Sequence, residues 1–155
     1  MNRTKKIVLI FICSHILASG TLKAQSHDED AQAISSAMSA LDEFMAAFNS
    51  RNMEAWAATL NYPHVRFASG DVTVWENAEE FKREATFERL PRTGWDHSHW
   101  LEREAILVSP GKIHINTVFQ RFNDKNEPIG TYESLYIVTQ VAGHWGTQAR
   151  SSLAP

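Results

Sequence analysis

The fold is decided by residues 95–151, which read WDHSHWLEREAILVSPGKIHINTVFQRFNDKNEPIGTYESLYIVTQVAGHWGTQARS. Turn residues divide this stretch at 109–112 (SPGK), 123–128 (NDKNEP) and 142–143 (AG). Proline presets one turn dihedral and glycine accepts a positive φ, so these segments favour reversals of the chain. The runs between them are rich in β-branched and aromatic residues, which suit a half-buried pleated surface. We therefore predict antiparallel strands over residues 95–108, 113–122, 129–141 and 144–151.

Side chains in these strands alternate between the two faces of the sheet. Ile113, Ile115 and Phe119 share one face of their strand. In the following strand Tyr132 and Tyr136 share a face. Neither face of either strand is wholly polar, so we expect both faces to be partly covered.

The segment before the sheet shows helical spacing. Apolar residues recur at alternating steps of four and three, which places them on one helical face: Ile34, Met38, Leu41, Met45 and Phe48. This helix is expected to end near residues 49–52. Asn52 can cap a second, short helix containing Trp56, which stops before Pro63 because the residue before proline disfavours the α region.

A hairpin and a third helix lead into the sheet. Residues 65–75 predict a hairpin with its turn at 68–71 (ASGD). Asn77 and Glu80 have the spacing of a capping box, which predicts a helix over residues 78–89. Pro91 and Gly94 then end that helix.

Helices followed by a long antiparallel meander predict an α+β architecture with the helices gathered on one face of the sheet. This order resembles the nuclear transport factor 2-like (NTF2-like), or SnoaL-like, superfamily over roughly residues 30–151. The resemblance rests on four segments: residues 43–49 (EFMAAFN), the short helix with Trp56, residues 71–81 (DVTVWENAEEF) and residues 143–145 (GHW).

The resemblance implies a curved antiparallel sheet wrapped by three N-terminal helices into a cone, the cystatin-like or SnoaL-like fold, with a pocket inside. Members of the superfamily include isomerases, dehydratases, cyclases and epoxide hydrolases, and also proteins without catalytic activity. Membership therefore does not select a function.

The N-terminus predicts export. Arg3, Lys5 and Lys6 precede an apolar run of about twelve residues, within the range of a signal-peptide core. That run is shorter than the roughly 20 residues that span a bilayer. We predict a signal peptide over residues 1–24, a flexible leader over 25–30 and one SnoaL-like domain over 31–152. The mature protein is then periplasmic or secreted, with no membrane segment; an uncleaved anchor is the alternative.

Charge and cysteine content exclude several classes of function. Residues 1–24 carry four basic and no acidic side chains, so the remainder has 11 basic and 18 acidic residues, a net charge near −7. This charge argues against a nucleic-acid partner, because phosphate binding needs clustered cations. The single cysteine, Cys13, lies in the predicted signal, which leaves the mature chain without disulfides or thiolate metal sites.

Histidines and tyrosines are the candidate chemical groups. His97 and His99 fall on one face of their strand and, with His64 or His114 as a third ligand, have the chemistry of a metal site. A structural or pocket-rim role is favoured, so no metal and no cofactor are predicted. Proton transfer is a second option, with candidates that have titratable or hydroxyl groups: His64, His97, His99, Tyr132 and Tyr136. The aspartate or Tyr/His/Asp sets of catalytic relatives do not match this chain, so the catalytic residues stay unassigned.

Aromatic residues near strand ends can stack on a ligand or belong to the core. Taken with the histidines and tyrosines, they give the predicted pocket lining: His64, Trp75, Trp95, His97, His99, Phe119, Tyr132 and Tyr136.

Two arginines, Arg121 and Arg150, lie in strands that are otherwise rich in apolar residues. A buried arginine needs a carboxylate partner, and Glu133 or Glu104 are the candidates. Surface ion pairs are favoured, and binding of an anionic ligand is the alternative.

The sequence therefore predicts an exported protein that binds a small, largely apolar molecule in a conical pocket. Catalysis is left open; it would be cofactor-independent acid–base chemistry of the isomerase, dehydratase or cyclase type. The alternative is a non-catalytic ligand-binding or dimeric interaction module with a filled pocket. We expect a homodimer formed through the outer sheet face, which carries a mixed surface: His114, Asn116, Val118, Gln120 and Phe122.

Overall fold

The computed structural model describes residues 18–68 and 70–154, with side chains from residue 27 onward. Three helices and a short 3₁₀ turn accompany six strands. In chain order the elements are α1 (Ala18–Asn49), α2 (Met53–Ala58), β1 (Leu60–Ala68), β2 (Asp71–Trp75), α3 (Ala78–Glu84), η1 (Pro91–Thr93), β3 (His97–Ser109), β4 (Lys112–Phe122), β5 (Pro128–Val141) and β6 (His144–Ser152).

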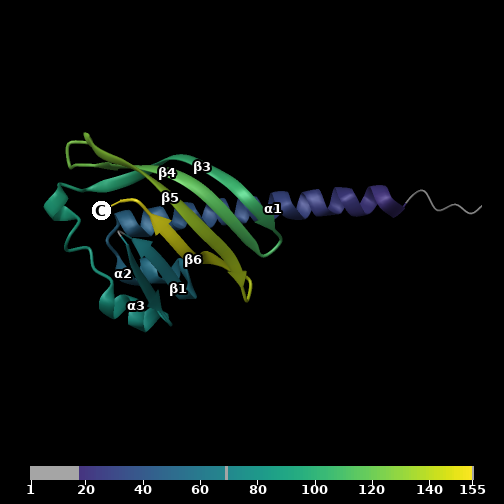
Figure 1. Cartoon of the computed structure of the whole chain (residues 1–155), viewed down its shortest axis with the longest axis horizontal. Helices are drawn as coiled ribbons and strands as arrows, with labels where there is room; N and C mark the ends of the chain where they lie inside the picture. Colours follow the sequence, from purple (N-terminus) through teal and green to yellow (C-terminus); the bar gives the residue numbers. More distant parts are fainter. Residues whose placement is uncertain (1–17, 69, 155) are drawn as a thin grey trace, which may run out of the picture.

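All six strands form one curved sheet, in the order β2-β1-β6-β5-β4-β3 (Figure 1). The predicted four-strand meander is confirmed, with strand ends shifted by two residues or fewer. The pairing of β1 with β6 is parallel, whereas a wholly antiparallel sheet was predicted. Through this pairing the β1–β2 hairpin joins the same sheet as the four-strand meander.

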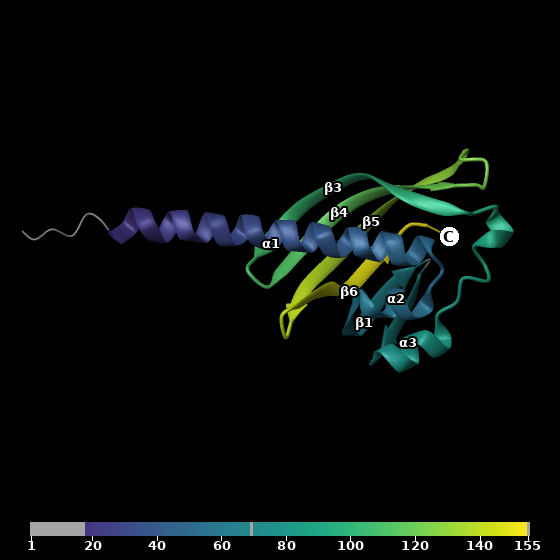
Figure 2. The same ribbon diagram turned by 180° about the vertical axis from the view of Figure 1, so that it is seen from behind.

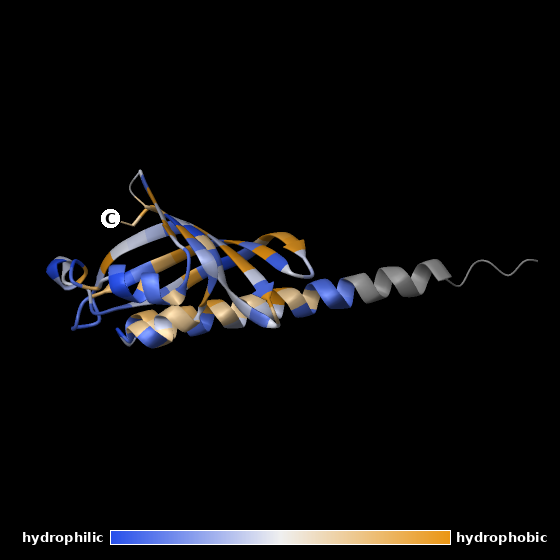
Figure 3. Cartoon of the chain, turned by 90° about the horizontal axis from the view of Figure 1, so that it is seen from below, coloured by the Kyte–Doolittle hydropathy of each residue, from blue (hydrophilic) through white to orange (hydrophobic). Residues whose placement is uncertain are grey.

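Helix α1 lies across the concave face of the sheet, and its N-terminal part extends beyond the sheet (Figures 1 and 2). The buried face of α1 is rich in alanine, which lets the helix approach the sheet closely: Ala33, Ala37, Ala40, Leu41, Phe44 and Ala47. In Figure 3, the part of α1 that lies against the sheet contains many hydrophobic residues. The coloured part of α1 that borders the grey segment is hydrophilic.

Residues 25–30 differ from the prediction, because they continue α1 instead of forming a flexible leader. This segment contains no glycine or proline, and two of its residues, Gln25 and Glu29, are good helix formers. Within the described residues, no helix combines the length and apolar character needed to cross a membrane.

Polar side chains tie the C-terminal half of α1 to β3. The Asn49 side chain donates to the Ser98 carbonyl and accepts from the Ser98 amide, both at 2.9 Å. Trp100 Nε1 donates to the Leu41 carbonyl at 3.2 Å. Arg103 donates to the Met38 carbonyl at 3.1 Å and to the Asp42 carboxylate at 2.7 Å. These bonds fix the helix over one edge of the sheet.

Helices α2 and α3 and strand β2 form an aromatic core around Phe81, which is fully buried. Its ring meets Trp56 at 4.9 Å and Trp75 at 5.1 Å, both edge to face. Asn77 accepts from the Glu80 amide at 3.0 Å, which confirms the predicted cap. Helix α3 nevertheless ends at Glu84 and not at residue 89, because the next residue adopts an extended conformation.

Candidate functional site

The concave face of the sheet brings arginines together. Arg66 of β1 pairs with Arg150 of β6, and Arg150 pairs with Tyr136 of β5. Residues paired across neighbouring strands project to the same face, so these three side chains form one row. Arg121 of β4 lies on the same face, an even number of residues from Ile115, which pairs with Tyr136.

None of these three arginines takes part in an ion pair within residues 27–68 and 70–154. The predicted partners Glu133 and Glu104 are exposed, and the register places both on the convex face. Arg121 is only 7 % exposed. The expectation of surface ion pairs for Arg121 and Arg150 is therefore wrong, because the inward-facing register carries both guanidinium groups away from the acidic surface.

Aromatic rings surround the two C-terminal arginines. The Arg150 guanidinium carbon lies 5.4 Å from the ring centroids of Phe44 and Trp56. The Arg121 guanidinium carbon lies 5.0 Å from the Tyr132 centroid and 5.9 Å from that of Phe119. Such cation–π contacts offset part of the cost of burying a charge.

The Nε atoms of Arg121 and Arg150 are buried and lack a hydrogen-bond partner among the described residues. Arg150 and Arg66, taken as whole residues, are intermediate in exposure, so each keeps some contact with solvent. The site therefore holds donors that the described protein atoms leave free.

The electrostatics of the cluster are unfavourable without a counterion. Burial lowers the pKa of the Arg150 guanidinium, the adjacent Tyr136 hydroxyl opposes this shift, and the positive charge of Arg121 adds to it. Burial also lowers the pKa of Arg66, and the charge of Arg150 lowers it further. The pKa of Arg121 is lowered by burial first, and also by Arg66. The three cations thus repel one another in a poorly solvated space.

Hydroxyl groups occupy the sheet between Arg121 and Arg150. Ser134 Oγ donates to Ser152 Oγ at 3.0 Å, and Thr117 Oγ1 donates to the Ser134 carbonyl at 3.1 Å. Ser134 and Thr117 are both buried. The concave face is consequently polar along this strip, although aromatic side chains border it.

His64 is fully buried beside this cluster. Its Nδ1 lies 3.0 Å from the Thr147 carbonyl, so Nδ1 carries the proton and donates, and Nε2 is left as an acceptor without a partner among the described residues. Burial, followed by the charge of Arg150, lowers the pKa of His64 to about 3. A neutral imidazole of such low basicity is a weak general base near pH 7.

The two remaining histidine candidates lie on the convex face. His97 pairs with Phe122 and His99 with Gln120, and this register turns both away from His64 and the tyrosines. His97 Nδ1 lies 2.9 Å from Asp96 Oδ2, and the His97 ring stacks on Phe122 at 5.2 Å. In the described part of the chain no three histidine, cysteine or acidic residues are grouped as metal ligands.

The aromatic candidates divide between core and cone. Trp75 and Trp95 are 6 % and 2 % exposed and belong to the core. Trp75 stacks on His64 at 5.8 Å, and Trp95 Nε1 donates to Ser98 Oγ at 2.9 Å. Phe119 and Tyr132 lie 5.5 Å apart near Arg121. The register thus places His64, Trp75, Phe119, Tyr132 and Tyr136 on the concave side of the sheet, with His64 and Trp75 in contact at one part of it and Phe119 and Tyr132 at another; His97 and His99 lie on the convex side.

The chain after β6 closes over this region. The Leu153 amide donates to the Glu133 carbonyl at 3.1 Å, and the Ala154 amide to Ser152 Oγ at 3.2 Å. Ala154 is buried and packs against Met45 and Phe119. The segment therefore packs between the C-terminal half of α1 and the concave face of β4.

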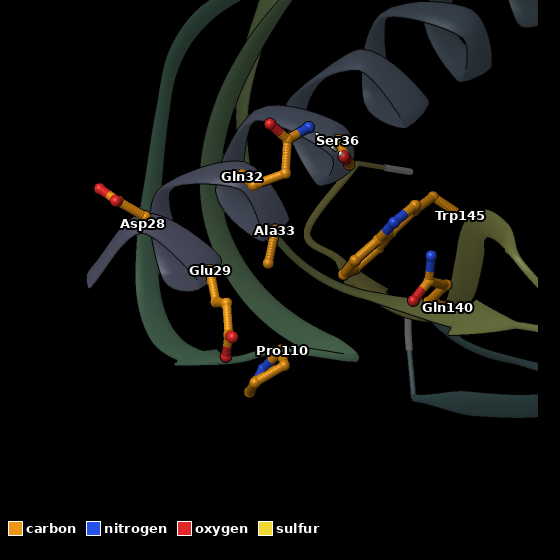
Figure 4. Close-up of a pocket in the computed structure, with 8 residues that line it drawn as sticks. All are labelled: Asp28, Glu29, Gln32, Ala33, Ser36, Pro110, Gln140 and Trp145. Carbon is orange, nitrogen blue, oxygen red and sulfur yellow. Dashed lines mark hydrogen bonds between the residues drawn. The ribbon is translucent and has the colours of Figure 1, made fainter. Parts of the chain in front are cut away.

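A groove with a volume of about 780 Å³ lies between the N-terminal part of α1, the β3–β4 turn and the ends of β5 and β6 (Figure 4). Its lining is mixed, with two acidic side chains and one indole: Asp28, Glu29, Gln32, Ala33, Ser36, Pro110, Gln140 and Trp145. A smaller hollow of about 280 Å³ lies beside the β1–β2 turn. Neither hollow contains a predicted pocket residue.

Arg66 is the site residue that sequence reasoning missed. The signal was present, since His64, Arg66 and Ala68 alternate with Val65 and Phe67. The apolar side chains of Val65 and Phe67 suggest that their face of β1 is the buried one, yet Phe67 is 46 % exposed on the convex side. The polar members of β1 face inward.

The curved sheet, the helices on its concave face and the polar interior define an NTF2-like α+β cone. A family model described as NTF2-like protein (DUF6841) matches residues 29–149, and the chain belongs to this family. The resemblance inferred from the sequence is thereby confirmed. No curated protein matches the sequence.

Solved structures share the fold at low sequence identity. An NTF2-like protein with a cystatin-like fold from Novosphingobium aromaticivorans has a TM-score of 0.63 at 10 % identity, covering 91 % of each chain. A ketosteroid isomerase-like protein from Erwinia carotovora atroseptica has a TM-score of 0.56 at 19 % identity, covering 78 % of this chain and 96 % of the other. An NTF2-like protein from Shewanella oneidensis has a TM-score of 0.59 at 12 % identity, covering 83 % and 98 %. These likenesses establish the fold and not an activity.

Proposed function

We propose that this NTF2-like chain binds a small organic anion inside the cone, with Arg66, Arg121 and Arg150 as the cationic groups that hold it. The observation that carries this proposal is that the Nε atoms of Arg121 and Arg150 are buried without a hydrogen-bond partner, and that neither arginine has a carboxylate partner, among the described residues. An unpaired buried ion costs several kcal/mol. A bound carboxylate or similar oxyanion would remove that cost, and arginine is well suited to hold it because its planar fork of donors matches both oxygens.

The surrounding side chains favour a ligand with an apolar body. Phe44 and Trp56 flank Arg150, and Phe119 and Tyr132 flank Arg121. Ligand sites in proteins bind the body of a ligand by apolar contact and orient it through a few polar groups. The proposal therefore keeps the largely apolar ligand predicted from the sequence and adds an acidic group to it.

Binding without catalysis is the function that the geometry favours. The low pKa of His64 makes it a weak base, and burial raises the pKa of Tyr136, which makes its hydroxyl a weak acid. Isomerase-type proton transfer is the second candidate, and the likeness to ketosteroid isomerase-like proteins supports it at the level of fold.

The test is a thermal-shift and calorimetric screen of small acids, each paired with its uncharged methyl ester. A ligand at 100 times its dissociation constant adds about 2.7 kcal/mol to the free energy of unfolding. We expect acids such as benzoate or isophthalate to bind and their full esters to fail. Equal binding of acid and ester, or binding that survives Arg150→Met, would contradict the proposal. Arg92→Met, at an exposed arginine of η1, is the matched control.

We also propose that the protein is exported and dimeric. The basic and apolar N-terminal sequence supports cleavage near residue 24, and mass spectrometry of the protein recovered from the periplasm or medium tests it. The convex face of β4 supports a homodimer, since Asn116 is exposed and Val118 only half-buried there. Light scattering tests the dimer.

A further inference from the structure

We propose that the convex face of the sheet carries a binding site for a divalent transition-metal ion of the zinc or copper class, with His97, His99 and Asn126 as its protein ligands. The site lies on the opposite face from the arginine cluster, so it is independent of the proposed anion binding. It departs from the prediction of no metal, which was made because the sequence shows two histidines and fixes no third ligand. Asn126 supplies that ligand from the distant loop between β4 and β5.

The rings of His97 and His99 have the spacing of two ligands on one ion. Their ring centroids are 5.0 Å apart, and the ring planes are inclined by 70°. Zinc binds a histidine nitrogen at about 2.0–2.1 Å, which puts the ion about 3.2 Å from the centroid of the ring. Two imidazoles that bind one ion at an angle of about 90–110° therefore have centroids about 4.5–5.2 Å apart. The observed spacing falls in this range.

Asp96 orients the His97 ring as a metal ligand. His97 Nδ1 lies 2.9 Å from Asp96 Oδ2. Because a carboxylate oxygen only accepts, Nδ1 carries the proton, and Nε2 of the neutral ring has its lone pair available. The other carboxylate oxygen accepts from Arg51 at 3.3 Å, which fixes the carboxylate, and the His97 ring stacks on Phe122 at 5.2 Å. Carboxylate–histidine pairs of this kind hold the ligands of many metal sites in place.

The free nitrogen of His97 faces the side-chain oxygen of Asn126, at 3.2 Å. With the proton on Nδ1, both atoms are acceptors, and their lone pairs repel each other. A nitrogen and an oxygen that bind one ion at about 2.0–2.2 Å and about 90–110° lie about 2.8–3.5 Å apart, so one ion fits between them. A doubly protonated ring or a reversed Asn126 amide would also relieve the contact, and metal titration distinguishes these cases from a bound ion.

The site is open to solvent and suits a transition metal. His99 and Asn126 are both exposed, so an ion can reach them without movement of the sheet. Zinc sites with three protein ligands keep a fourth position for water. Imidazole nitrogens favour zinc and copper, whereas magnesium and calcium prefer a shell made of oxygen atoms.

The experiment is calorimetric titration of zinc chloride and copper chloride into protein that carries no polyhistidine tag and has been dialysed against EDTA. We expect saturable binding of one ion per chain. His97→Gln and His99→Gln should each weaken binding by about 100-fold. Asp96→Asn should weaken it by about 10-fold or more, the usual effect of losing an outer-shell partner.

Asn126 allows a test that preserves the backbone. Its φ is 61°, so Asn126→Gly removes the amide oxygen and keeps the left-handed conformation. This variant should weaken binding by about 10-fold, whereas Asn126→Asp should tighten it because a charged oxygen replaces a neutral one. His27→Gln, at an exposed histidine of α1, is the matched control and should bind as the wild type does. Circular dichroism and the unfolding temperature establish that each variant is folded.

Three results would overturn the proposal. The first is the absence of saturable binding of either ion to the wild type. The second is binding that survives both histidine substitutions, because the ion would then sit elsewhere. The third is binding that neither Asn126 variant changes, because the amide would then be a neighbour of His97 and not a ligand.

Discussion

Replacing Arg150 by methionine should stabilise the ligand-free protein. The substitution keeps an unbranched side chain against Phe44 and Trp56, and it removes a buried cation whose Nε has no partner among the described residues. Removal of a buried polar group usually destabilises a protein, whereas here we expect the free energy of unfolding to rise. The expected rise depends on Arg150 having no carboxylate partner.

The magnitude follows from four effects, two that favour the variant and two that oppose it. Desolvation of an ion costs several kcal/mol, and apolar replacement of buried ions has been worth about 1–4 kcal/mol. Loss of the contacts with the two rings costs about 1–2 kcal/mol. Loss of the contact with the Tyr136 hydroxyl costs about 1 kcal/mol. Relief of the repulsion from Arg66 and Arg121 favours the variant, so we expect a net gain of about 0–2 kcal/mol.

Urea unfolding of protein refolded without ligand measures this gain as a shift in the midpoint at constant slope. For a chain of this size, 1 kcal/mol corresponds to about 2–4 °C in the unfolding temperature. Arg92→Met should change stability by less than about 0.5 kcal/mol, as exposed sites usually do. A loss of more than 1 kcal/mol in Arg150→Met, with the helix content unchanged, would refute the reasoning, because it would mean that the guanidinium is well paired.

Four further outcomes follow from the structure. The pKa of His64 is about 3 in the folded protein and about 6.5 in the unfolded chain, so the unfolded chain binds the proton first and the free energy of unfolding falls as the pH drops below 6.5. Urea titrations should show that His64→Gln abolishes about 2 kcal/mol of the stability lost between pH 7 and pH 5. A pH profile identical to that of the wild type would contradict this. Phe81→Ala should cost about 3–5 kcal/mol in the same assay, because the buried ring leaves a cavity; a cost below 1 kcal/mol would place the ring outside the core. Asn77→Ala should cost about 1 kcal/mol through loss of the α3 cap, and Asn77→Asp should restore most of it. Val118→Asp should convert the proposed dimer to a monomer by light scattering, and a wild-type monomer would remove the proposal.

The fold was largely predictable because local signals agreed with one another. The turn segments, the alternating strands and the Asn77 cap each predicted what the structure contains. The parallel pairing of β1 with β6 was not predictable, since it joins segments about 80 residues apart and leaves no local signal. The length of α1 was underestimated because a polar segment without apolar periodicity was taken for a leader.

The site was harder to predict because it depends on register. His97 and His99 do share a face, as their spacing indicates, but only the pairing of His97 with Phe122 shows that this face is the convex one. Arg121 and Arg150 were identified as candidates from their apolar neighbours in the sequence. Only the structure shows that neither arginine forms an ion pair within the described residues. The pairing register of the strands decides which of these side chains project from the concave face of the sheet.

The central claim is that the cone holds an anion through Arg121 and Arg150. Calorimetric titration of isophthalate into the wild-type protein and into the folded double variant Arg121→Met/Arg150→Met tests it most directly. The account predicts saturable binding of one ligand per chain to the wild type and an affinity lower by about 100-fold or more in the double variant. Equal affinity in the two proteins, or saturable binding of dimethyl isophthalate alone, would contradict it.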